Sequence, residues 1–316
     1  LTDQQSYKVS FDVTEKIAGN YEYQVKVSPL NGEVDLVNNN STVYMSVIKA
    51  QLKALLLEGE PHWESTFLRR HLQKSSRVQL DSYTAYRDGT LSYMGNGVAS
   101  QKIPRDLNSF KEYDVVILGK EIERLYKKED LDELYKYVEK HGGVVIFSRG
   151  NALKKLDSEK WLEPVIWDNE AYDNVYLQAT NAGQKLALFT QNIEGDPSAP
   201  LLNFCRKVRS KKRLTTPLII AEDKQGNKST ALFYRRYGRG QVLSSGIDGL
   251  WQWKFNKFYT EDRDFYANFW DQTFLWMIHN SEFLPGKAFT FRHSQSNLKV
   301  NTKMSFRLSI RHQSDI

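Results

Sequence analysis

The sequence contains little cysteine and no long hydrophobic run, and each shortage excludes a class of protein. Cys205 is the only cysteine among 316 residues, which excludes an intrachain disulfide framework and a zinc site built on cysteines. No apolar segment approaches the roughly 20 residues of a membrane-spanning helix, and no signal peptide opens the chain. Because residue 1 is a leucine, we expect the chain to be a piece of a longer protein, and the missing signal says nothing about that parent.

The positive charge of the chain is concentrated in one segment. The formal net charge is +6, and six basic side chains lie within 206–213, so the remaining residues balance to zero (6 − 6 = 0). The six are Arg206, Lys207, Arg209, Lys211, Lys212 and Arg213. Such a cluster attracts phosphates, but it contains no aromatic residue that would stack on single-stranded nucleic acid. The pattern favours a solvated hairpin or loop, and we predict no nucleic-acid partner.

Residues 1–49 show the alternation of apolar and polar residues that is typical of strands with one face in a core. The alternation covers 7–13, 21–27 and 43–47. These strands are too few to form two well-packed sheets. We therefore predict that 1–49 is the C-terminal part of an immunoglobulin-like β-sandwich whose beginning lies upstream.

Between 50 and 285 strands alternate with helices, which predicts an α/β domain with a mainly parallel sheet. Helical spacing covers 61–73, 129–141 and a segment around 265–277. Strands are predicted over 52–57, 77–83, 113–119, 144–147, 186–190, 217–221, 230–235 and 241–245. We expect 53–57, 114–118 and 144–147 to be adjacent or nearly adjacent in the centre of the sheet. Alternation returns near the end of the chain, and 286–316 is predicted to begin a further β module.

Polar residues stand where four of the predicted strands end. In open α/β sheets, ligands bind at the carboxyl ends of the parallel strands. We therefore predict one contiguous crevice at this edge, although its ligand is not evident. Its members are Glu58, Gly59, Glu60, Gly119, Lys120, Ser148, Arg149 and Asp248.

The order of motifs resembles a known family. The motifs are 56–64 (LLEGEPHWE), 113–119 (YDVVILG), 142–147 (GGVVIF) and 237–243 (YGRGQVL), followed by Trp251-Gln-Trp253. Together they resemble the class I glutamine amidotransferase-like domains of large, uncharacterised, membrane-anchored bacterial proteins. The resemblance implies a flavodoxin-like, three-layer fold between immunoglobulin-like or adhesion-type β modules. It also implies a periplasmic or cell-surface location, with membrane attachment only through the parent protein.

The catalytic residues of that family are missing from this chain. Active members carry a cysteine in a Gly-x-Cys-x-Gly turn and a His-x-Glu pair after a later strand. Here Ile146 replaces the first glycine, Ser148 stands at the nucleophile position, and the later strand is followed by Asp248 with no histidine. The chain is therefore predicted to be a pseudoenzyme: a structural or interaction segment that contacts an unknown protein partner or neighbouring domains.

Two enzymatic alternatives stay open at the sequence level. Ser148 is a candidate nucleophile, with His62 as base and Asp248 as a further catalytic candidate, although bulky Ile146 opposes the strained turn that such a nucleophile needs. Glu58, Glu60, His62 and Glu64 are residue types that hold divalent metal ions. Acidic residues near a helix N-terminus are also stabilised by the helix dipole alone, so we predict no metal and no cofactor.

Overall fold

The computed structural model describes most of the chain in two compact units, Leu1–Ala50 and Gln51–Ile316. The described residues are 13, 15, 19–29, 32–33, 39–47, 51–95, 102–153, 162–184, 201–255, 264–279, 281, 289–293 and 306–310. The predicted strand 186–190 lies outside them, as does 7–13 apart from Val13. Among the described residues, no helix is both long enough and apolar enough to cross a membrane.

In the first unit the described strands form one antiparallel hairpin. Strand β1 (Gly19–Lys26) pairs with β2 (Asn40–Val47) in a register that places Tyr21 opposite Met45. The Tyr23 hydroxyl donates a hydrogen bond of 2.6 Å to the Glu15 carboxylate. Val43 is about half exposed, so the described hairpin does not itself enclose a hydrophobic core.

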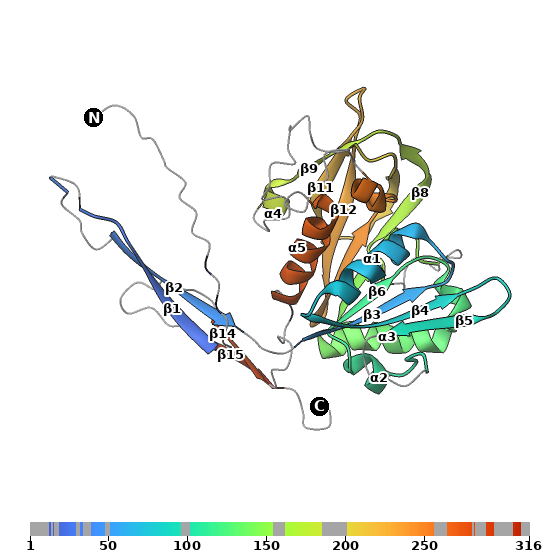
Figure 1. The fold of residues 1–316 in the computed structure, drawn as a ribbon, viewed down its shortest axis with the longest axis horizontal. Helices are drawn as coiled ribbons and strands as arrows, with labels where there is room; N and C mark the ends of the chain where they lie inside the picture. Colours follow the sequence, from blue (N-terminus) through green and yellow to red (C-terminus); the bar gives the residue numbers. More distant parts are fainter. Residues whose placement is uncertain are drawn as a thin grey trace. The chain divides into compact units, whose positions relative to one another are not determined.

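The second unit is built on a nine-stranded mixed sheet, shown in Figure 1. The spatial order is β5-β4-β3-β6-β7-β13-β12-β11-β9. The strands are β3 (Leu52–Glu58), β4 (Val78–Ala85), β5 (Leu91–Gly95), β6 (Val115–Leu118), β7 (Val144–Phe147), β9 (Tyr176–Ala179), β11 (Thr216–Glu222), β12 (Lys228–Tyr237) and β13 (Gly240–Ser245). The five from β4 to β13 in this order run parallel, which confirms the α/β class and the adjacency of β3, β6 and β7.

The prediction of a mainly parallel sheet is correct only for those five strands. The pairings β4–β5, β13–β12, β12–β11 and β11–β9 are antiparallel, so antiparallel and parallel pairings are equally numerous. Strand β5 lies in a stretch whose polar, glycine-containing sequence predicted no strand. It forms there because an edge strand needs to bury little: Leu91 and Met94 remain exposed.

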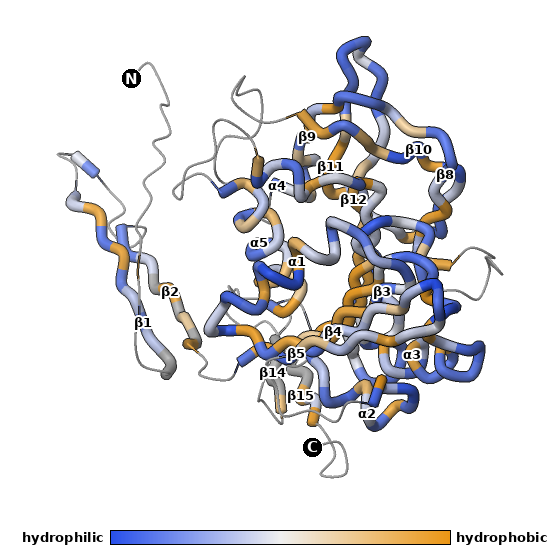
Figure 2. Tube along the Cα trace, turned by 45° about the vertical axis from the view of Figure 1, so that its right-hand side comes forward, coloured by the Kyte–Doolittle hydropathy of each residue, from blue (hydrophilic) through white to orange (hydrophobic). Residues whose placement is uncertain are grey.

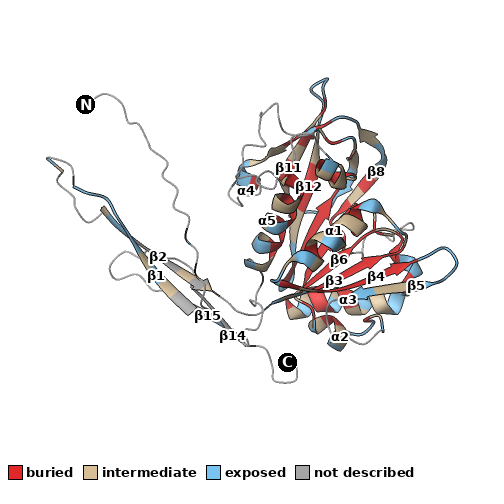
Figure 3. Ribbon diagram, viewed as in Figure 1, coloured by how far each residue is buried: buried red, intermediate tan, exposed pale blue. Residues whose placement is uncertain are grey.

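Helices cover both faces of the parallel strands, which gives three layers. Helix α1 (Trp63–Lys74) and helix α5 (Phe265–His279) lie on one face, and α2 (Leu107–Lys111) and α3 (Lys128–His141) lie on the other. Because side chains alternate along a strand, Leu56 packs toward α1 and α5, whereas Leu55 and Leu57 pack toward α3. Figure 2 shows the hydrophobic central strands, and Figure 3 shows that they are buried.

A second, two-stranded sheet holds most of the basic cluster. Strand β10 (Cys205–Lys211) pairs antiparallel with β8 (Val165–Tyr172). The prediction of a solvated hairpin or loop is therefore wrong for 206–211, which lie in a strand paired with a distant segment. Trp167 of β8 packs against Phe233 of β12, with ring centroids 5.7 Å apart, and this contact anchors the small sheet to the large one.

Short elements complete the second unit. They are η2 (Ile122–Arg124), α4 (Asn181–Gln184) and η3 (Leu250–Phe255), together with the antiparallel pair β14 (Phe289–His293) and β15 (Phe306–Ile310). Judged by its contacts, the segment 286–316 belongs to the second unit.

Candidate functional site

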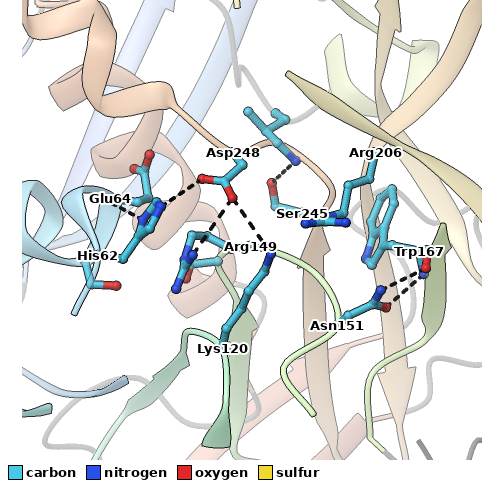
Figure 4. A network of polar contacts seen from close by, with 12 residues as sticks. His62, Glu64, Lys120, Arg149, Asn151, Trp167, Arg206, Ser245 and Asp248 are labelled. Carbon is cyan, nitrogen blue, oxygen red and sulfur yellow. Dashed lines mark hydrogen bonds and ion pairs between the residues drawn. The ribbon is translucent and has the colours of Figure 1, made fainter. Parts of the chain in front are cut away.

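The carboxyl ends of four parallel strands bring most of the predicted crevice residues together, as Figure 4 shows in part. Glu58 ends β3, Lys120 follows β6, Arg149 follows β7 and Asp248 follows β13. His62, from the start of α1, joins them through Asp248.

Glu58 and Arg149 form a buried ion pair at the carboxyl ends of β3 and β7. Arg149 Nη2 lies 2.8 Å from Glu58 Oε1, and both side chains are almost completely buried. The same carboxylate accepts a hydrogen bond of 2.9 Å from the Lys120 amide and another from the Ser65 hydroxyl. Burial raises the pKa of Glu58, and the positive charge of Arg149 opposes that rise. The hydrogen bonds matter because a buried pair is tolerated only when its remaining polar atoms have partners.

Two glycines allow the ends of β3 and β6 to approach closely. The Gly59 amide donates to the Lys120 carbonyl at 2.8 Å. A Cβ at Gly59 would overlap the Glu121 carbonyl, and a Cβ at Gly119 would overlap the Glu58 carboxylate. These positions therefore contribute backbone geometry to the crevice.

His62 is held at the N-terminus of α1 by its own ring. Its backbone is extended (φ −144°, ψ 150°), and Nδ1 accepts a hydrogen bond of 3.1 Å from the Glu64 amide, so His62 caps the helix. Nε2 faces Asp248 Oδ1 at 3.6 Å. Burial lowers the pKa of His62, and Arg149 lowers it as well. The sequence placed the helix start at Pro61; the helix begins two residues later because the histidine is the cap.

Asp248 lies among three side chains but makes no close contact with any of them. Its carboxylate oxygens are 3.6 Å from His62, 3.8 Å from Lys120 Nζ and 3.9 Å from Arg149 Nη1. Burial, followed by the charge of Arg206, lowers the pKa of Lys120 to about 8. Glu60 is half-buried, and its negative charge acts on both Lys120 and His62.

Ser148 lies at the predicted turn, and its hydroxyl is bonded to the backbone. Its side chain is buried, and its hydroxyl donates to the Leu118 carbonyl at 3.2 Å, while its amide donates to the same carbonyl at 2.9 Å. Within the described residues, the hydroxyl forms no hydrogen bond with a histidine. The structure therefore brings His62 and Asp248 together but leaves Ser148 outside that pair.

The acidic residues around α1 do not converge on one point. Glu58 is directed at Arg149 and Ser65, whereas Glu64 is buried beside η3, where its Oε2 accepts a hydrogen bond of 3.1 Å from the Trp251 amide. Burial raises the pKa of Glu64 to about 7. In the part of the chain that the structure describes, no group of three or more acidic, histidine or cysteine side chains is arranged to hold a metal ion.

Two residues that sequence reasoning missed complete the surroundings of the crevice. Arg206 of β10 donates from Nη1 to the Asp168 carbonyl at 3.2 Å, and its guanidinium lies over the Phe204 ring. Glu163 is fully buried and accepts hydrogen bonds from the Asn151 and Ala152 amides, the Trp167 indole and the Ser244 hydroxyl. Arg206 was visible only as one member of the basic cluster, and no local pattern marked Glu163.

No protein-family model and no curated protein match this sequence. Several solved structures are similar to the chain. A cytoplasmic protein from Salmonella typhimurium aligns with 82% of this chain and 96% of its own, at 14% identity and a TM-score of 0.46. A β-galactosidase from Bacillus circulans aligns with 78% of this chain and 34% of its own, at 12% identity and a TM-score of 0.42. A ThuA-like protein from Parabacteroides merdae aligns with 62% of this chain and 78% of its own, at 15% identity and a TM-score of 0.36. Likenesses this remote bring no activity to the chain.

Proposed function

We propose that this chain is a non-catalytic structural or interaction segment of a larger extracytoplasmic bacterial protein. The observation that carries the proposal is the state of Ser148. At the position where a nucleophile would stand, a buried hydroxyl donates to the Leu118 carbonyl. An unassisted serine hydroxyl is a poor nucleophile near neutral pH, because catalysis needs a base within hydrogen-bond reach.

The neighbouring charges support the same proposal. Arg149, the residue after Ser148, forms an ion pair with Glu58 inside the unit. The Nδ1 atom of His62 accepts a hydrogen bond that caps α1. His62 and Asp248 have the chemistry of a base and its orienting acid, but the hydroxyl of Ser148, the nucleophile candidate from the sequence, is bonded to the Leu118 carbonyl instead of to His62. The alternative of a serine- or metal-dependent hydrolase therefore rests on the His62–Asp248 pair alone.

The domain assignment is part of the proposal. Numbered along the chain, the five parallel strands have the order 2-1-3-4-5, which is the order of flavodoxin-like sheets. This order supports a flavodoxin-like domain over 50–285, and from the sequence resemblance we propose that it is amidotransferase-like. The unit boundary after Ala50 supports a separate β module over 1–49. We also propose a further β module from 286 on; its described part is the antiparallel pair β14–β15, which belongs to the second compact unit. We propose that both modules are immunoglobulin-like.

The proposed setting follows from the same resemblance. The family that the sequence resembles implies a domain outside the cytoplasm that is attached to the membrane through the parent chain, so we propose a periplasmic or cell-surface location. Its partners would be another protein or the neighbouring domains of the parent.

An activity panel tests the proposal. Purified protein is incubated with glutamine and with a set of esters and amides, beside the Ser148→Ala and His62→Ala variants. We expect no release of ammonia and no hydrolysis that either substitution abolishes. Robust hydrolysis that is lost in both variants would replace this proposal with a serine hydrolase.

A further inference from the structure

Two buried hydrogen-bond donors at the carboxyl edge of the parallel strands have no partner in the described residues. They are the Nε groups of Arg149 and Arg206. The Lys120 ammonium lies 3.8 Å from Asp248 Oδ2, which is beyond hydrogen-bond distance. Buried donors are almost always satisfied in folded proteins, so a group of orphaned donors indicates an acceptor that comes from outside the chain.

The three cations lie within electrostatic reach of one another. The charges of Arg206 and Arg149 both act on Lys120, and the charge of Arg149 acts on Arg206. Placing like charges together is unfavourable unless an anion is shared among them. Figure 4 shows Lys120 and Arg149 directed at Asp248, with Arg206 lying near Ser245. The side chains of Lys120 and Asp248 are 17% and 20% exposed and therefore touch solvent, whereas that of Arg149 is 2% exposed.

We propose that Lys120, Arg149 and Arg206 form a binding site for an oxyanion, the phosphate or carboxylate group of a small ligand, at the carboxyl edge of the parallel sheet. Arg206 and the Nη1 group of Arg149, whose Nη2 is paired with Glu58, offer planar donors that suit an oxyanion, and Lys120 adds a point charge. The inference deepens the proposed function because it names the class of ligand that the same crevice takes, and it requires no catalysis.

Asp248 acts as an internal competitor in this site. In the free protein its carboxylate faces Lys120 Nζ and Arg149 Nη1 at distances too long for hydrogen bonds, while Arg149 Nη2 is paired with Glu58. An incoming oxyanion would form shorter contacts with the same cations and leave Asp248 with His62 alone. The loop beside Asp248 includes Gly249 (φ +111°), a conformation that favours glycine. Removing the charge of Asp248 should therefore strengthen oxyanion binding.

Titration calorimetry tests the site with two probes, inorganic phosphate and succinate, at constant chloride concentration and pH 7. We expect saturable binding of at least one probe, and the tighter probe identifies the ligand group as phosphate or carboxylate. Lys120→Gln and Arg206→Gln should each weaken binding about tenfold, as expected for the loss of a charged hydrogen bond. Asp248→Asn should strengthen it about tenfold, because a nearby like charge is removed. Circular dichroism and a thermal melt confirm that each variant is folded.

Arg209→Gln is the matched control, since Arg209 lies on the same strand as Arg206 but is exposed. It should bind both probes as the unmodified chain does. Equal affinities in Arg206→Gln, Lys120→Gln and Arg209→Gln would overturn the proposal, as would Asp248→Asn with no detectable binding. Calorimetry measures binding alone, so its failure would leave the activity panel unaffected, and hydrolysis in that panel would leave the binding result standing.

Discussion

Arg149 and Glu58 are separated by 91 positions in the chain, and their side chains meet at 2.8 Å inside the second unit. Each is the partner that makes the other's burial tolerable. The two residues therefore stabilise the fold jointly, and substitutions at the two positions should have non-additive effects on the free energy of unfolding.

The first prediction concerns that pair. Arg149→Met leaves the Glu58 carboxylate buried without a counter-charge, so it should lower the free energy of unfolding by about 3–5 kcal/mol. The double variant Glu58→Leu/Arg149→Met should lose clearly less than the sum of the two single variants. Urea denaturation measures each value. Lys136→Met, which removes the exposed i,i+3 pair with Glu133, is the control and should change stability by less than about 1 kcal/mol. Additive losses in the cycle would show that the pair is not coupled.

The second prediction is a pH dependence that originates at Glu64. Burial raises the pKa of Glu64 from 4.5 to about 7 in the folded chain. Between these pH values the folded state binds more protons than the unfolded state, so stability falls as the pH rises through this window. At about 1.4 kcal/mol per pKa unit, the effect is on the order of a few kcal/mol.

Comparison with Glu64→Gln isolates this contribution, because other carboxylates titrate in the same range. Unfolding free energies are measured by denaturation at intervals from pH 4.5 to 7.5, and the curve of the variant should fall less steeply than that of the unmodified chain. Glu129→Gln, an exposed change in the first turn of α3, should keep the original slope. Parallel curves for all three proteins would refute the assignment to Glu64.

The third prediction concerns Glu163, whose carboxylate accepts hydrogen bonds from four donors and has no counter-charge in an ion pair among the described residues. Glutamine has nearly the same shape but turns one acceptor into a donor. In Glu163→Gln the side-chain amide group would face one of the present hydrogen-bond donors, so that neither of them has an acceptor. The substitution should therefore lower the unfolding free energy by about 2–4 kcal/mol. The exposed change Glu170→Gln, next to Lys207, should cost less than about 1 kcal/mol. A Glu163→Gln variant as stable as this control would show that the buried network tolerates an amide.

The fourth prediction uses the single cysteine. Burial raises the pKa of the Cys205 thiol to about 12, so very little thiolate is present near neutral pH. In the native chain, a thiol-specific reagent such as dithiobis-nitrobenzoate should react only as fast as the region opens. Denatured protein should react at once, with one thiol per chain. Immediate, complete labelling of the native chain would mean that the β10 region is open in solution.

The elements that the sequence predicted well are those whose local pattern agrees with their burial. The run Ala54–Leu57 is apolar on both faces because helices cover both faces of β3, and its boundaries follow from that. The end of α3 was predicted equally well, since Gly142 adopts the left-handed conformation (φ 75°) that ends a helix. Strand β10 was missed because its charged side chains resemble a loop, and only pairing with β8 makes it a strand.

The site was predictable in position but not in chemistry. Strand ends placed Glu58, Lys120, Ser148 and Asp248 at one edge, as parallel topology requires. The direction of the Ser148 hydroxyl depends on the backbone geometry at the ends of β6 and β7, which no local pattern encodes. The presence of Arg206 near Lys120 likewise depends on how β10 folds back over the large sheet.

The connectivity of the crevice has a kinetic consequence. The crevice residues lie as far apart in the sequence as Glu58 and Asp248, and each is positioned by the pairing of strands that are distant in sequence. Pairings of this kind form slowly, because a long loop must close before any contact is gained. A partly folded chain would hold neither the Glu58–Arg149 contact nor the cations around Asp248. The capacity to bind an anion should therefore appear last during refolding, after secondary structure has returned, and a bound anion would mark molecules whose central sheet is complete.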